Sequence, residues 1–279
     1  MKEKPIKRDI IVTGIPRSGT TLACTLINSL SNSVCLSEPA IVDKFINIAQ
    51  SPDEYIRLLE DEYDRLRGHI WQTRQIFNKH GLEGGKITNY FSRDTQGQTA
   101  VNFKVEKEKV EISDEYFILG MKHNAHFMSI LPQLARNSRF SIFAIIRDPI
   151  ATILSWRSLS LPVSEGRLPA ARKFWSVIRA IEDSGESILV KQVRIYEQFC
   201  LRLLEMEKFI CLIQYEDIIN NPEYFGRFFG QTPLYQTPIK FRNIDSYPNK
   251  DEAQIILQNI ERYAPSALHI YRTLAGSHL

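Results

Sequence analysis

The chain has 279 residues and a formal net charge of +3, with 43% hydrophobic and 24% charged residues. This composition is that of a globular protein rather than a disordered one, and the length suits one large α/β domain or two small domains. The small charge and the absence of a long lysine and arginine run argue against a nucleic-acid partner.

The first residues, Met1–Arg8, are polar and give no secretory signal. No stretch reaches the roughly 18 apolar residues that a membrane span needs. The four cysteines are scattered without a CxxC pair, which indicates reduced, mostly buried thiols rather than a zinc site or disulfides: Cys24, Cys35, Cys200 and Cys211. We therefore expect a cytoplasmic protein.

A phosphate-binding loop is predicted between the first strand, Ile10–Thr13, and the first helix, Thr20–Leu30. The segment Gly14–Thr21 has the spacing of a P-loop, G-x-x-x-x-G-K-[ST], but Thr20 replaces the lysine and a positive charge lies three positions earlier, at Arg17. Backbone N–H groups of such a loop and the helix behind it bind phosphate oxygens. Kinases and NTPases use the missing lysine and Mg²⁺ to neutralise the β- and γ-phosphates, so its loss favours a donor with less charge at the transferring centre.

A second strand, Val34–Leu36, ends just before Glu38, which we expect at the same sheet edge as the loop. The next segment, Asp53–Lys79, predicts one long amphipathic helix, because large side chains recur every three or four residues: Tyr55, Leu59, Tyr63, Leu66, Ile70, Thr73 and Phe77. Gly81–Ser113 lacks periodicity and is rich in Gly, Lys and Glu, which predicts an insertion that forms a hairpin over the site.

Two more strands end in basic residues. Phe117–Met121 is followed by Lys122 and His123, and Phe140–Ile146 is followed by Arg147. The sequence Asp148-Pro149 after Arg147 suits a helix N-cap and first helical position. Arg147 should therefore lie at the carboxyl end of a strand, where open α/β sheets bind ligands.

The remaining predicted elements complete an α/β pattern. They are helices at Asp148–Ser158, Ala170–Asp183, Ser187–Glu207, Asp251–Tyr263 and Pro265–Leu274, a strand at Phe209–Gln214 and an ordered loop at Gly230–Asn249. Short apolar strands separated by helices predict a three-layer α/β/α sandwich of P-loop type with a central, mostly parallel sheet. We expect a single domain over residues 1–279, with a helical and insertion segment at about residues 40–113.

Three segments resemble the PAPS-dependent sulfotransferases, whose donor is 3′-phosphoadenosine-5′-phosphosulfate (PAPS). Pro16–Thr21 is similar to their 5′-phosphosulfate loop, P-[KR]-S-G-T-T. Arg147 and Ser155, eight residues later, resemble the arginine and serine that hold the 3′-phosphate. Cys211–Ile218, followed by Asn221-Pro222, resembles the strand-end Y-E-D-L segment with its D/N-P pair. The match is closest to tyrosylprotein, heparan-type and bacterial sulfotransferases, and it covers the chain from Ile10 to Pro222.

The resemblance implies transfer of a sulfuryl group from PAPS to a hydroxyl without a metal. The acceptor would be a small molecule, a carbohydrate or a peptide; its identity and the oligomeric state stay open. The donor-binding residues would be Arg17, Ser18, Gly19, Thr20, Thr21, Arg147, Ser155 and Tyr215, the last of these near adenine. Glu216 and Asp217 are expected to cap the next helix. Weaker candidates are Arg157 for an auxiliary contact, and Lys240, Arg242 and Lys250 for the late basic loop over the 3′-phosphate.

The catalytic base is either Glu38 or His123. Glu38 matches the position of the glutamate in tyrosylprotein and heparan-type relatives. Cytosolic relatives carry the histidine base in K-T-H, but here His123 comes one position early and would point another way. We prefer Glu38 as the base, with Arg17 and Lys122 stabilising charge on the bridging oxygen, and we expect His126 on a helix surface.

Two other classes of function stay open. A P-loop kinase or NTPase would be revealed by magnesium-dependent ATP turnover. A catalytically inactive nucleotide-binding protein would bind PAPS without transferring its sulfuryl group.

Overall fold

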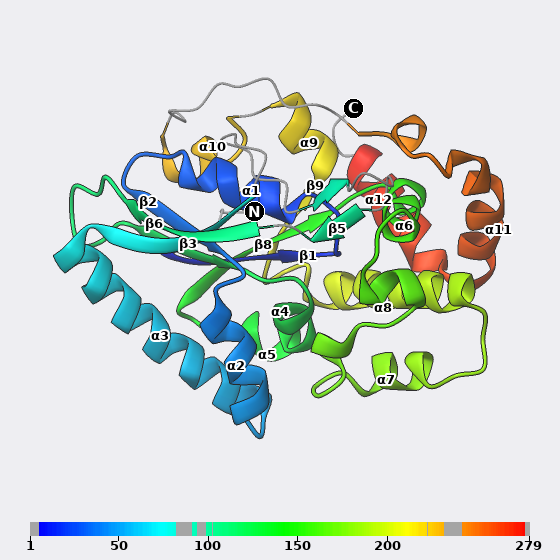
Figure 1. The fold of residues 1–279 in the computed structure, drawn as a ribbon, viewed down its shortest axis with the longest axis horizontal. Coiled ribbons are helices and arrows are strands. Elements are labelled where there is room, and N and C mark those ends of the chain that lie inside the picture. Colours follow the sequence, from blue (N-terminus) through cyan, green and yellow to red (C-terminus); the bar gives the residue numbers. More distant parts are fainter. Residues whose placement is uncertain are drawn as a thin grey trace.

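The computed structural model describes residues 6–81, 91–93, 99–101, 103–221, 223–231 and 242–276. Its core is a sheet of five parallel strands in the order β2-β7-β1-β8-β9 (Figure 1). The strands are β1 (Asp9–Gly14), β2 (Ser33–Ser37), β7 (Ile118–Lys122), β8 (Phe140–Ile146) and β9 (Cys211–Gln214). All pair in parallel, as at Val12, which lies between Lys122 and Phe143. The predicted α/β fold with a central parallel sheet is confirmed.

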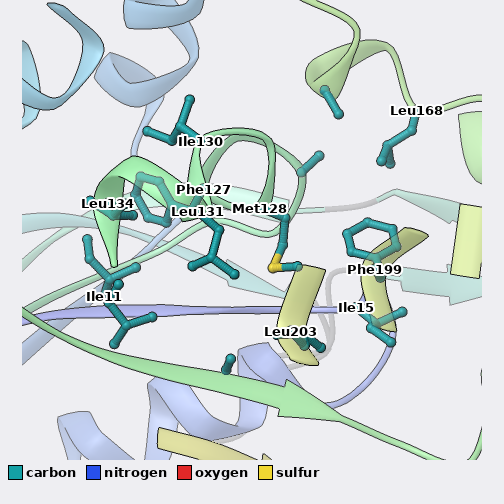
Figure 2. Close-up of a cluster of buried hydrophobic side chains, with 14 of the residues drawn as sticks. Ile11, Ile15, Phe127, Met128, Ile130, Leu131, Leu134, Leu168, Phe199 and Leu203 are labelled. Carbon is teal, nitrogen blue, oxygen red and sulfur yellow. The ribbon is translucent and has the colours of Figure 1, made fainter. Parts of the chain in front are cut away.

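Helices cover both faces of the sheet because alternate strand side chains enter two separate apolar clusters. Ile10 and Val12 of β1 pack toward α1 (Thr20–Asn28), α9 (Tyr215–Asn220) and α10 (Gly226–Phe229). On the opposite face, Ile11 and Ile15 pack among side chains of α4 (Ala125–Ser129), α5 (Leu131–Leu134) and α8 (Ile188–Met206) (Figure 2). The result is a three-layer sandwich that fixes the strand ends from both sides.

The long predicted helix is wrong at its carboxyl end. Helix α3 covers Pro52–Thr73 and stops at Arg74, whose φ of 54° is left-handed. Strand β3 (Gln75–Gly81) follows and pairs in antiparallel fashion with β6 (Phe103–Lys109). The alternating sequence of β6 provides a strand partner far along the chain, and that pairing overrides the helical spacing near Phe77. A second antiparallel pair, β4 (Phe91–Arg93) with β5 (Thr99–Val101), agrees with the expected hairpin structure.

Other helices follow the expected order with altered ends. They are α2 (Ala40–Ile48), α6 (Pro149–Arg157), α7 (Ser176–Glu182), α11 (Ala253–Tyr263) and α12 (Pro265–Gly276), with 3₁₀ turns at Pro162–Glu165, Pro169–Ala171, Ile244–Ser246 and Lys250–Glu252. The single helix predicted over residues 170–183 is broken, because Trp175 has non-helical dihedrals (φ −136°, ψ 82°) and buries its ring edge-on against Phe199. Part of the loop predicted over residues 230–249 lies outside the described residues. Within the described ranges, no helix is both long and apolar enough to cross a bilayer.

Candidate active site

The carboxyl ends of all five parallel strands meet at one edge of the sheet, and each supplies a residue that the sequence singled out. In strand order these are Glu38, Lys122, Arg17, Arg147 and Tyr215. Because β1 lies at the centre of the sheet, its loop is flanked on one side by the ends of β7 and β2 and on the other by the ends of β8 and β9. The edge therefore has two halves around the loop.

The loop after β1 is held against β8. Gly14 has a φ of 138°, and a Cβ there would lie 2.2 Å from the Ile145 carbonyl oxygen, so only glycine fits. The Ser18 hydroxyl donates to that same carbonyl at 2.8 Å. The Trp156 indole N–H donates to the Pro16 carbonyl at 2.8 Å. These bonds hold the loop in place, so the Ser18 hydroxyl has a structural role.

Helix α1 begins directly behind the loop, at Thr20. The first N–H groups of a helix have no partner within it, and they attract anions. Gly19, the N-cap, has a φ of 96°, and a Cβ there would lie 2.5 Å from the Tyr215 ring. Thr20 is buried and Thr21 is half-buried at this helix start. The predicted order of strand, loop and helix is present.

Arg17 lies in the loop with a left-handed φ of 72°. Its Nε donates to the Ser155 hydroxyl at 3.3 Å, joining two residues that the sequence placed in separate anion sites. Burial lowers the pKa of Arg17 to about 10, and the nearby charges of Arg242 and Arg147 contribute to that lowering. Three arginines close together favour an anionic ligand between them.

Arg147 is 4% exposed at the end of β8. Its Nη1 donates to the Tyr247 hydroxyl at 3.0 Å and to the Arg17 carbonyl at 3.2 Å, and its Nη2 donates to the Arg242 carbonyl. Its Nε is buried and has no hydrogen-bond partner among the described residues. Tyr247 escaped the sequence analysis because it lies 100 residues away in an irregular segment with no motif.

Tyr215 is the first residue of α9 and lies between the loop and Arg147. The Arg147 guanidinium is 4.6 Å from the centre of its ring, and burial raises the pKa of the Tyr215 hydroxyl. Gln214 is the N-cap of this helix, so Glu216 and Asp217 lie in its first turn instead of capping it as expected.

On the other half of the edge, Glu38 and Lys122 form an ion pair. Lys122 Nζ lies 2.5 Å from Glu38 Oε1, and the Glu38 backbone N–H donates to the Lys122 carbonyl at 2.8 Å. The Lys122 side chain is 3% exposed and that of Glu38 is 32% exposed. Burial favours a raised pKa for Glu38, but the charge of Lys122 outweighs it and lowers the pKa to about 2. Glu38 is therefore ionised at neutral pH.

His123 points away from this pair toward Asp43, a residue of α2 that the sequence analysis missed. The His126 backbone N–H donates to His123 Nδ1 at 3.3 Å, so the proton of a neutral His123 lies on Nε2, 3.1 Å from Asp43 Oδ1. The His126 ring stacks on that of His123 at 4.0 Å. The expected surface position of His126 is wrong: the side chain is buried, which lowers its pKa to about 3.

Asp43, His123 and His126 bring ligand atoms within 4.8 Å of one another, a spacing that suits a metal ion. A metal-binding histidine normally donates its second ring N–H to an acceptor. His123 instead meets an N–H donor at Nδ1 and carries its proton on Nε2. The tautomer is therefore the wrong one for a metal ligand, and the three residues form a hydrogen-bonded cluster.

The remaining candidates are used elsewhere or lie apart. Arg157 pairs with the carboxylate of Glu252, and Lys250 lies 3.7 Å from Asp245. Arg242 contributes its carbonyl to Arg147, and Lys240 lies outside the described residues. As expected, the cysteines are free thiols and mostly buried.

The chain was compared with solved structures, with curated proteins and with family patterns. A solved structure described as a sulfotransferase domain from the curacin biosynthetic pathway matches with a TM-score of 0.44 and 12% identity, covering 86% of this chain and 80% of that one. A sulfotransferase from Mycobacterium tuberculosis H37Rv matches with a TM-score of 0.39 and 14% identity, covering 93% of this chain and 77% of that one. A search of curated proteins finds no match. The sequence pattern of the sulfotransferase family matches residues 9–226, most of the chain, and the protein belongs to that family.

Proposed function

We propose that the protein transfers a sulfuryl group from PAPS to an acceptor hydroxyl. The observation that carries the proposal is the buried guanidinium of Arg147 beside Arg17, at the strand edge where a P-loop-like turn begins α1. Arginine has five N–H donors. Three of them have partners in the described residues, and Nε is among those left, which fits a phosphate.

The two anion sites suit the two ends of this donor. Arg17 and the backbone N–H groups of residues 19–21 would hold the 5′-phosphosulfate. Ser18 would shape the loop, because its N–H donates to the Ile15 carbonyl and its hydroxyl to the Ile145 carbonyl. Arg147 and Ser155 would hold the 3′-phosphate. Tyr215, stacked between Gly19 and Arg147, would support both sites and face the adenosine.

Glu38 and Lys122 would carry out the transfer step together. The acceptor oxygen forms a bond to sulfur while the bond from sulfur to the bridging phosphate oxygen breaks, and Glu38 takes the hydroxyl proton. Lys122 and Arg17 would stabilise the negative charge that develops on the bridging oxygen. While it is paired with Lys122, Glu38 is a weak base, so its proton transfer requires Lys122 to shift toward the donor. The buried thiols also suit the cytoplasmic location that we propose.

Calorimetry with 3′-phosphoadenosine-5′-phosphate in excess chelator tests the proposal. We expect nanomolar to micromolar affinity without added metal, because arginines and backbone donors supply the positive charge. Absence of binding, or binding only with Mg²⁺, would overturn it. Magnesium-dependent hydrolysis of ATP would instead identify a P-loop NTPase.

A further inference from the structure

The β3–β6 ribbon has two different faces. Residues directly opposite in an antiparallel pair share a face, and successive residues alternate between faces. In this register Phe77, Lys79, Val105 and Phe103 lie on one face, together with Lys107 opposite Phe77 and Lys109 opposite Gln75. The opposite face begins with Ile76, which is buried in the main core. The first face is therefore the one turned away from that core.

This face lies close to the proposed base. Strand β3 packs against β2, and Glu38 follows directly after β2 (Figure 1). The positive charge of Lys79 helps to lower the pKa of both Glu38 and Asp43, which places its ammonium on the Glu38 side of the sheet edge. Lys79 Nζ also lies 4.9 Å from the centre of the Phe103 ring. The lysine thus links the ribbon face to the catalytic carboxylate.

The same face exposes large apolar side chains. Phe77 is 64% exposed, Val105 56% and Phe103 42%. Contiguous exposed apolar residues beside polar catalytic groups are typical of a ligand-binding surface. Next to Glu38, the positive charges of Lys79 and Lys122 face the carboxylates of Glu38 and Asp43, whereas Lys107 and Lys109 lie further back along the face. The apolar side chains on the part of the face nearest Glu38 favour an acceptor with an apolar body.

We propose that the ribbon face formed by Phe77, Lys79, Phe103 and Val105 is the acceptor wall, and that the acceptor is an alcohol or phenol with an apolar body. The body would lie against Phe103 and Val105, with Phe77 further back along the ribbon. Its hydroxyl would point to Glu38. This inference rests on the proposed sulfuryl transfer and adds the chemical class of the acceptor.

Two aromatic substitutions with a matched control test the wall. Phe103→Thr and Phe77→Thr remove an exposed ring but keep a residue that suits a strand. Tyr116→Thr is the control, because Tyr116 is 70% exposed and lies just before β7, at the amino edge of the sheet. The probes are 2-naphthol and N-acetylglucosamine, with PAPS as donor. Initial rates give kcat/KM, and saturation-transfer NMR gives binding without turnover.

We expect 2-naphthol to be sulfated in preference to N-acetylglucosamine. Phe103→Thr should lower kcat/KM for 2-naphthol about tenfold and weaken the saturation-transfer signal of 2-naphthol. Phe77→Thr should have a smaller effect on both quantities, and Tyr116→Thr should change neither. Preference for the sugar, or equal effects of Phe103→Thr and Tyr116→Thr, would overturn the acceptor wall while leaving sulfuryl transfer intact. Failure to bind 3′-phosphoadenosine-5′-phosphate would count against the proposed function alone. Even if the nucleotide did not bind, the acceptor wall could still be tested by NMR. If NMR detected no binding of 2-naphthol, the proposed acceptor wall would be rejected.

Discussion

The two halves of the strand edge are built by different means. On the side of β8 and β9, the loop carbonyls accept hydrogen bonds from Trp156 and Arg147. Glycines occupy the loop positions at which a Cβ would clash with neighbouring atoms. On the side of β2 and β7, side chains pair with each other, as Lys122 does with Glu38 and His123 with Asp43. The first half brings together Arg17, Arg147 and Arg242, whereas the second pairs its lysine with a carboxylate.

This difference matches two kinds of ligand. An excess of buried guanidinium groups is stabilised by an anion such as a nucleotide phosphate. A neutral pair of opposite charges instead offers a base and a cation that act only once they separate. We infer that the first half is preformed for the donor and that the second half becomes active after the donor binds. Substitutions in the two halves should therefore affect different measured quantities.

The largest expected effect is that of Glu38→Gln. A base acts in the transition state, so kcat should fall about 10²–10⁴-fold while donor affinity stays nearly unchanged. Glutamine can still accept a hydrogen bond from Lys122, but the buried ammonium loses its counter-charge. Thermal unfolding of the variant should be measured beside single-turnover rates to separate lost stability from lost catalysis.

His123→Ala is the control for this substitution. Both ring nitrogens of His123 are engaged in the structure, so turnover should fall much less than in Glu38→Gln. If Glu38→Gln keeps wild-type turnover and His123→Ala abolishes it with normal nucleotide binding, the base is the histidine. The two halves of the edge would still differ, but Glu38 would not be the base that we propose.

An intermediate effect is expected from Arg147→Ala in the donor half. A charge-assisted contact contributes about 1.5–3 kcal/mol, so the affinity for 3′-phosphoadenosine-5′-phosphate should fall about 10–100-fold. Adenosine 5′-monophosphate, which lacks the 3′-phosphate, should lose much less. Calorimetry with both nucleotides measures the difference. Equal losses would mean that Arg147 acts through the Arg17 and Arg242 carbonyls that it holds, as a structural residue.

The same contrast explains how much could be predicted from sequence. The ends of β1 and β8 were located because strand, turn and helix signals lie within about ten residues, as at Asp148, which caps α6 with a 2.7 Å bond to the Ala151 N–H. The contact of Tyr247 with Arg147 was not predictable, because it joins residues 100 positions apart without a motif. The Asp43–His123 pair depends on where α2 lies relative to the residues after β7, and local patterns do not contain that information.

The β3–β6 ribbon is a second case in which local sequence patterns were not sufficient. Spacing of large residues suggested a helix through Phe77, and only the distant strand β6 makes the β conformation favourable there. Local signals therefore located the half that we propose for the donor, whereas the half that we propose for the acceptor depends on tertiary pairing. That is why the sequence alone left the acceptor undetermined and the choice of base open.

The smallest expected effect is on how the free energy of unfolding depends on pH. This measurement distinguishes the two halves of the edge without any ligand. The pKa of Glu38 is lowered from its usual 4.5 to about 2 in the folded protein. A carboxyl group with a lowered folded pKa stabilises fully above its unfolded pKa, and that contribution is lost as pH falls from about 4.5 toward about 2. Urea unfolding from pH 6 to pH 3 should thus show wild type losing more stability than Glu38→Gln. The difference should be less than about 1.4 kcal/mol per pH unit, because water screens the partly exposed carboxylate. Arg147→Ala should change the slope at higher pH instead, because the charge of Arg147 acts on Asp148 and Glu216, whose pKa values are raised by burial. Parallel curves for wild type and Glu38→Gln would show that the Glu38–Lys122 pair does not stabilise the acceptor half.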